Sequence, residues 1–385
     1  MKHRLLALCI ALLLPLTAVL AEEAPPAPAV HDMGLELMGS SVHYPQLTGL
    51  ADPQVQAQTN AAIMEAGQIN DRLGRMAVLG SAPVKLSVTY AYTLSGDVFS
   101  CAMLSDGAVE NSRATQVWSA VNVRLSTGQT ITFDDLFLDA DAATAYIEAY
   151  LEEQVAPELS AHLEAGCLTP IPNLFTLSPT GLTLYYDIAS FRTLSDKAGT
   201  VTILWSELRD HLALGEADVL TSLGVGEHLD FPASAASRLT QAFSGGSLTG
   251  IPAAIGQPMQ ELIDRYALLT DPDIYEGGRM IALEDGAFRQ VWILTDALTE
   301  DFDQSIVQGI RADRLNLNGL CTGVTTTVGW REHLGAPEAT LIVDETRAES
   351  WRIVPGSSDY YTFGDYRLRL HADETGVLRS VFLTK

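Results

Sequence analysis

The sequence predicts an α+β fold in which each of two domains has an antiparallel sheet with packed helices. At several points a glycine follows Thr or Asp between two segments of alternating apolar residues, as at Thr127-Gly128, Thr180-Gly181, Asp285-Gly286 and Thr375-Gly376. Such glycines supply the positive φ that tight hairpins require. Many hairpins, long alternating strands and few helices favour antiparallel pairing over a doubly wound parallel sheet.

The first 21 residues have the features of a secretory signal. Lys2 and Arg4 precede an apolar run from Leu5 to Leu16, and short side chains lead up to Ala21. This order predicts cleavage after Ala21, a flexible Pro- and Ala-rich leader over 22–32, and a secreted or cell-envelope location outside the cell. A retained anchor is the competing interpretation, although a membrane span needs about 20 apolar residues. No stable membrane span is expected after cleavage.

The first domain is predicted to span residues 33–213. Asp52-Pro53 combines an N-cap acid with proline at the first helical position, which predicts a helix start. Alternating apolar residues predict strands in 85–94 and 117–125. A helix is expected over roughly 141–155, near Pro157, and a hairpin is expected around "FTLSPTGLTLYY".

Gly, Ser and Ala cluster over residues 223–250, which predicts a linker over 214–247 between the first domain and a second one over 248–385. The second domain has an internal repeat: "LTGIPAAIGQPMQELIDRY" and "LNGLCTGVTTTVGWREHLG" share a pattern and are each followed by strands. We therefore expect a duplicated helix-plus-sheet unit.

Charge and cysteine content limit the partners and the covalent links. With 48 acidic and 23 basic residues, the net charge of −25 disfavours nucleic acid and is compatible with cationic partners or with solubility alone. An oxidising compartment permits a disulfide. Cys101 and Cys167 both fall in the first domain, so we expect this pair, whereas Cys321 is expected to be a buried small hydrophobe.

Four segments, in this order over residues 42–213, carry a family resemblance: "HYPQLTGLADPQVQAQTNAAI", "STGQTITFDDLF", "FTLSPTGLTLYYDIASF" and "KAGTVTILWSEL". Together they resemble domain of unknown function 3298, an extracellular domain of Gram-positive cell-surface proteins. It precedes the catalytic part of certain peptidoglycan deacetylases and forms the outer part of a lysozyme-sensing anti-sigma factor. The resemblance implies an α+β domain that binds rather than catalyses. The C-terminal part is more weakly similar to the repeat domains of beta-lactamase inhibitor proteins.

No catalytic residue, metal ligand or cofactor is predicted. The eight histidines are scattered without HxxH or HExxH spacing, and a G-x-S-x-G elbow is missing. The acids Asp134, Asp135, Asp139 and Asp141 lack the spacing of a calcium loop, and Asp139 or Asp141 suits a helix N-cap.

Tyr185 and Trp118 are the candidate binding residues. Each falls on the strand face opposite the one assigned to the core, where an exposed ring would suit a sugar or a protein partner. The competing interpretation is that helices cover these faces.

The predicted function is that of a secreted, non-enzymatic envelope protein that binds a lysozyme-like protein or a peptidoglycan-type glycan. The alternative is a cell-wall-active hydrolase, or a hydrolase inhibitor, whose site is not recognisable from the sequence.

Overall fold

The computed structural model describes most of residues 27–385. Nothing is described for residues 1–26, 38, 80–83, 110–114, 158, 160–162, 164–165, 189–198, 230, 252, 266–271, 276–277, 284–289, 297–301 and 318. The predicted signal and the first part of the leader therefore lie outside the described residues. None of the described helices has the length and apolar character needed to cross a membrane.

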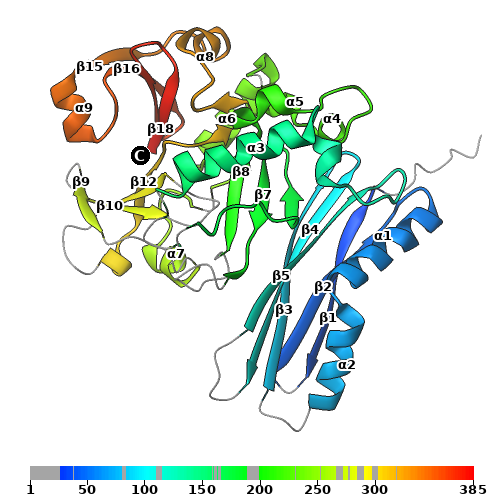
Figure 1. Ribbon diagram of the computed structural model, residues 1–385. Helices are drawn as coiled ribbons and strands as arrows, with labels where there is room; N and C mark the ends of the chain where they lie inside the picture. The colour runs from blue at the N-terminus through cyan, green and yellow to red at the C-terminus, as the bar shows by residue number, and fades with distance from the viewer. Residues whose placement is uncertain are drawn as a thin grey trace, which may run out of the picture.

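The architecture is α+β, as predicted, and the described residues form three hydrophobic cores. Figure 1 shows a long sheet flanked by α1 and α2, a middle part around β7 and β8, and a larger sheet at the opposite end.

The first sheet has five strands in chain order, antiparallel except where β2 meets β3. Asp52 caps α1 as predicted, since its carboxylate accepts the Gln54 N–H at 2.7 Å, and Pro53 is the first helical residue. Ile63 and Ile69 of the helical segment share a buried core with Phe99 and other residues of one sheet face. The elements are β1 (Ala29–Leu37), β2 (Ser40–Thr48), α1 (Pro53–Ala66), α2 (Ile69–Leu79), β3 (Val84–Ser95), β4 (Val98–Val109) and β5 (Thr115–Arg124).

The central part packs on strands β4 and β5 through a second core, to which Val98 and Leu104 belong. Asp139, one of the two acids expected as the N-cap, caps its main helix by accepting the Ala142 N–H at 3.0 Å. The elements are a 3-10 turn (Phe133–Leu136), α3 (Ala140–Tyr150), a π-helical turn (Leu151–Val155), β6 (Phe175–Leu177), β7 (Gly181–Tyr185), β8 (Thr200–Leu204), two 3-10 turns (Trp205–Glu207 and Arg209–His211), α4 (Val219–Leu223) and α5 (Gly226–Leu229).

The C-terminal sheet has eight strands in the order β15-β16-β17-β18-β12-β11-β10-β9. In the first half α6 and α7 precede four strands; in the second α8 precedes four strands and α9 follows the first of them. The halves join where β12 pairs with β18. The first half has α6 (Ala233–Ser244), α7 (Met259–Arg265), β9 (Asp273–Tyr275), β10 (Gly278–Leu283), β11 (Val291–Thr295), a 3-10 turn (Phe302–Gln304) and β12 (Val307–Ala312). The second has a ribbon of β13 (Asn316–Leu317) and β14 (Leu320–Cys321), then α8 (Thr327–Leu334), β15 (Ala339–Val343), α9 (Glu345–Trp351), β16 (Gly356–Phe363), β17 (Tyr366–Asp373) and β18 (Leu378–Thr384).

A largely buried ion pair joins the central part to the segment that follows β12 of the C-terminal part. Arg314 donates from Nε to Glu207 Oε1 at 2.8 Å and from Nη2 to the Thr202 carbonyl at 2.9 Å. Tyr150 Oη donates to the same carboxylate at 2.7 Å. Burial raises the pKa of Glu207, but the charge and hydrogen bonds of Arg314 outweigh this and hold the pKa below its ordinary value.

The predicted disulfide between Cys101 and Cys167 is not formed in the structure. Cys101 is buried in the core between the five-stranded sheet and its helices, whereas Cys167 packs against the core of the central part. The two thiols therefore belong to different cores. Burial raises the pKa of the Cys101 thiol to about 12. Cys321 is buried, as predicted.

Candidate functional site

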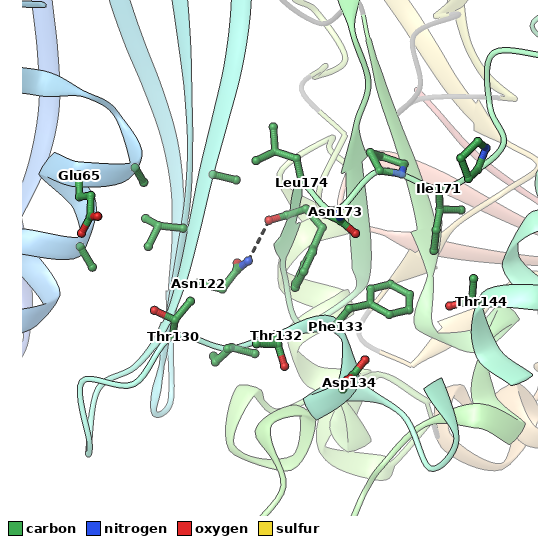
Figure 2. A pocket seen from close by; sticks show the side chains of 18 of the residues that line it. Glu65, Asn122, Thr130, Thr132, Phe133, Asp134, Thr144, Ile171, Asn173 and Leu174 are labelled. Carbon is green, nitrogen blue, oxygen red and sulfur yellow. Dashed lines mark hydrogen bonds between the residues drawn. The ribbon is translucent and has the colours of Figure 1, made fainter. Parts of the chain in front are cut away.

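A groove of about 790 Å³ lies where the five-stranded sheet meets the central part. One wall comes from α1 and β5, and the other comes from α3 and the segment 170–175, with residues 130–134 between them. Figure 2 shows Glu65 on one side of this space and Ile171, Asn173 and Thr144 on the other.

Carboxylates reach the groove from three separate elements. Glu65 belongs to α1, Asp134 to a 3-10 turn and Glu148 to α3. Glu65 and Asp134 are exposed, and Glu148 is half-buried. Among the residues that line the described groove there is no Lys, Arg or His. The groove is thus negatively charged at neutral pH.

Helical spacing explains how these acids come to face the groove. On α1, Ala62 lies three residues before Glu65 and four before Ala66. Side chains three or four residues apart share a helix face, so all three line the groove. The alanines are small, so they leave space beside the carboxylate. On α3, Thr144 and Glu148 are four residues apart and face the groove in the same way.

Carboxylates of α3 and its π-helical extension hold the opposite wall. Glu148 Oε1 accepts the Ile171 N–H at 3.3 Å, and Glu152 Oε1 accepts the Thr169 hydroxyl at 2.8 Å. Glu148 therefore has a structural task as well as a place in the groove.

A buried polar pair fixes the back of the groove. Ser100 Oγ donates to Asn122 Oδ1 at 2.6 Å, and Asn122 Nδ2 donates to the Phe175 carbonyl at 2.9 Å. Ser100 Oγ in turn accepts the Leu177 N–H at 2.7 Å. These bonds join β4 and β5 to β6, so both walls are held at a fixed separation.

The chemistry of the lining suits a ligand with positive charge and hydrogen-bond donors. Carboxylate and hydroxyl oxygens of the acids and threonines are acceptors, whereas Phe133, Ile171 and Leu174 offer apolar surface. Phe133 is itself supported by Phe175, with the ring centroids 5.9 Å apart. Ligand sites commonly combine such apolar walls with a few polar groups.

The candidate residues Trp118 and Tyr185 are brought together, but outside this groove. Their ring centroids are 4.9 Å apart, across the contact between β5 and β7. Tyr185 Oη lies 3.0 Å from Thr176 Oγ1, and burial raises the pKa of Tyr185 to about 12. The binding role of these two residues stays a prediction.

Local capping occupies two members of the acid cluster at 134–141. Asp135 accepts the Thr132 N–H at 2.7 Å, and Asp139 caps α3. Across the described ranges, no three His, Cys, Asp or Glu side chains gather closely enough to hold a metal ion.

The sequence alone did not reveal Glu65, Asn122 or Glu148. They lie on three elements that fold together only in the tertiary structure. The four-residue spacing of Thr144 and Glu148 was visible, but this spacing occurs on any helix face.

Solved structures of two families of unknown function are among those similar to this chain. A Bacteroides fragilis member of the domain of unknown function 3298 family matches at TM-score 0.37 and 11% identity, over 51% of this chain and 95% of its own. A Pseudomonas aeruginosa protein of the same family matches at 0.36 and 12%, over 49% and 95%. A Bacillus subtilis protein of the domain of unknown function 4309 family matches at 0.23 and 16%, over 40% and 96%.

The family that the sequence segments resemble is thus also the family of the first two structures. No family model matches the chain, and no curated protein matches it.

Proposed function

We propose that this protein is a secreted, non-enzymatic binding protein of the cell envelope that recognises a lysozyme-like protein or a peptidoglycan-type glycan in its acidic groove. The observation that carries the proposal is the groove itself, with Glu65, Asp134 and Glu148 on three sides and no cationic side chain in its described lining. A location outside the cell is supported by the basic and apolar start of the sequence.

The two ligand classes share the chemistry that such a groove attracts. A lysozyme-like protein is cationic, and peptidoglycan stem peptides carry free amines. Carboxylates around a concave site focus a negative potential, which raises the local concentration of positively charged groups and their association rate. The hydroxyls of Thr130, Thr132 and Thr144 can accept further N–H groups.

A pull-down with the purified protein from residue 22 onward tests this proposal. Insoluble peptidoglycan and resin-coupled lysozyme serve as baits, each at low and at high salt. We expect retention on at least one bait that weakens as salt rises, because exposed charges are screened. Retention on neither bait would overturn the proposal.

Charge-matched variants locate the binding. The double variant Glu65→Gln with Asp134→Asn removes two exposed groove acids and leaves Glu148 in place to hold Ile171. Glu332→Gln with Glu349→Gln removes two exposed acids from α8 and α9. We expect the groove variant to lose about tenfold in affinity, roughly 1.4 kcal/mol, and the control to bind as the parent protein does. Equal losses in both would show that only the net charge matters.

A further inference from the structure

A row of alternating aromatic and arginine side chains crosses the eight-stranded sheet. Strand register pairs Trp292 with Arg311, Arg311 with Phe382, Phe382 with Arg369, and Arg369 with Tyr360. The row therefore runs over β11, β12, β18, β17 and β16 without a gap, and it includes the join between the two halves of the sheet. Directly paired residues on an antiparallel sheet share a face, so these side chains stack along it.

The two arginines of the row differ in how their N–H groups are used. Arg311 is bound at every edge: it donates to both carboxylate oxygens of Asp313 and to the carbonyls of Trp351 and Arg352. Arg369 lies 3.5 Å from the centroid of Phe382 and 4.7 Å from that of Trp351. Its guanidinium makes no hydrogen bond or ion pair with any described residue, although its backbone pairs with β16 and β18. The rings of Phe382 and Trp351 hold the Arg369 side chain in place and leave its N–H donors unused.

Two further arginines near Arg369 are held in the same way. Arg367, two residues along β17, lies over the Tyr360 ring at 4.4 Å and is exposed. Arg347 lies over Trp351 at 5.6 Å and donates one N–H to the Ile342 carbonyl. Within the described residues, neither has a carboxylate partner.

Elsewhere in the C-terminal part, arginine side chains form ion pairs. Several arginines there are paired with a carboxylate: Arg311 with Asp313, Arg314 with Glu207, Arg331 with Asp359, Arg352 with Asp273, and Arg379 with Asp373. In a chain with a net charge of −25, three guanidinium groups without an acid partner lie against Trp351 or Tyr360, and Tyr360 is the register partner of Arg369. We call Arg347, Arg367 and Arg369 the arginine cluster.

We propose that the arginine cluster binds an acidic glycan, a sugar chain that carries carboxylates. A guanidinium presents a planar fork of donors that matches a carboxylate in two parallel hydrogen bonds. The rings of Tyr360 and Trp351 are half-buried, so each keeps an edge or face for the C–H groups of a sugar. A nucleic acid fits less well, because the overall negative charge repels a dense line of phosphates.

This inference goes beyond the proposed function. The arginine cluster lies on the C-terminal sheet and attracts anions, whereas the acidic groove lies beside β5 and attracts cations. Variants at one site therefore leave the other intact, and either proposal can fail alone.

Affinity electrophoresis of the purified protein through gels that contain polygalacturonate tests the proposal. Pullulan is the neutral sugar control, and polyglutamate presents carboxylates on a peptide backbone. We expect retardation by polygalacturonate alone. No retardation, equal retardation by pullulan, or equal retardation by polyglutamate would each overturn the assignment to an acidic glycan.

Variants identify the residues. Arg347→Gln with Arg367→Gln removes two charges from the arginine cluster, and we expect about tenfold weaker binding from the loss of charge-assisted hydrogen bonds. Arg75→Gln with Arg379→Gln removes two charges elsewhere and should bind as the parent protein does. Binding by the first variant that equals the control would overturn the site.

Arg369→Lys tests the guanidinium fork itself, because it keeps the charge but not the planar donors. We expect binding between that of the parent protein and that of the double variant. The groove variant Glu65→Gln with Asp134→Asn should bind polygalacturonate at least as well as the parent, and thermal unfolding midpoints confirm that each variant is folded.

Discussion

Arg314 and Arg369 are two arginines that expose little surface and are held in opposite ways. At the junction between the central part and the C-terminal sheet, 8% of the Arg314 side chain is exposed, and its donors are used by Glu207 and the Thr202 carbonyl. On the face of the C-terminal sheet that carries the row of aromatic and arginine side chains, 8% of Arg369 is exposed, and its guanidinium lies against two aromatic rings. An acid partner uses the N–H donors of a guanidinium, whereas ring partners leave them available.

The difference separates a structural arginine from one that can serve a ligand. Removal of an arginine from a buried ion pair leaves a carboxylate without its counter-charge, which is costly. Removal of an arginine from between two rings leaves no charged group behind. Substitution of Arg314 should therefore cost more stability than substitution of Arg369. Substitution of Arg369 should weaken ligand binding more than substitution of Arg314.

The largest expected effect is at the junction. Arg314→Met should lower the free energy of unfolding by about 3–5 kcal/mol, because Glu207 stays largely buried without a cation. Urea denaturation followed by tryptophan fluorescence measures the loss. The double variant with Glu207→Gln should lose less than Arg314→Met alone, since no unpaired charge remains. A loss below about 1 kcal/mol, the size typical of a surface pair, would contradict the burial argument.

The second effect concerns an uncharged junction, between the five-stranded sheet and β6. Asn122→Ala should lower the free energy of unfolding by about 1–3 kcal/mol, because the Phe175 carbonyl and the Ser100 hydroxyl lose their buried partner. Asn173→Ala, at an exposed position on the groove edge, is the control and should change little. Equal unfolding midpoints for the two variants would show that the polar pair does not hold this junction.

The third effect is at Arg369 itself. Arg369→Met keeps most of the apolar stem and loses the attraction to Phe382 and Trp351, so we expect a loss of about 0.5–2 kcal/mol. The same urea series as for Arg314→Met measures it. A loss of unfolding free energy as large as that of Arg314→Met would show that Arg369 has a structural task.

The smallest effect is a change in acid sensitivity. The pKa of Glu207 in the folded protein is below its ordinary value, so its contribution is complete above the unfolded pKa of about 4.3 and is lost as pH falls through the lower folded value. Unfolding midpoints measured from pH 6 to pH 3 should fall less steeply for Glu207→Gln than for the parent protein. Arg369→Met should follow the slope of the parent, because arginine keeps its charge throughout this range.

The flattening should be incomplete, because other carboxylates titrate in the same direction. Although partial burial acts against it, hydrogen bonds from Thr375, Arg379 and the Val377 N–H lower the pKa of Asp373 to about 2. A slope for Glu207→Gln that equals the parent slope would show that Glu207 does not contribute to acid sensitivity.

Local features were predictable from the sequence where neighbouring residues decide the outcome. The Asp52-Pro53 helix start, the N-cap at Asp139 and the strand that follows Gly181 all depend on a few adjacent positions. The α+β class followed from repeated alternation and glycine turns.

Features that depend on contacts between distant segments were not predictable. The disulfide was expected from shared domain membership, but Cys101 and Cys167 pack into different cores. The groove takes side chains from several elements, and the arginine row depends on the register between β12 and β18. The sequence also did not show that the ring of Tyr185 would pack on Trp118, because this contact joins two separate strands.

The position of β18 has a consequence for the order of folding. This strand comes last of the described elements along the chain, yet it lies in the middle of the eight-stranded sheet, between β12 and β17. During synthesis, β12 therefore lacks its neighbour β18 until residues near 378 have emerged. At roughly 5–20 residues per second, this is several seconds after β12 itself has emerged. For that interval β12 is an open edge, to which another chain could add a strand. A factor that shields such edges during synthesis or export would act on this protein at that stage.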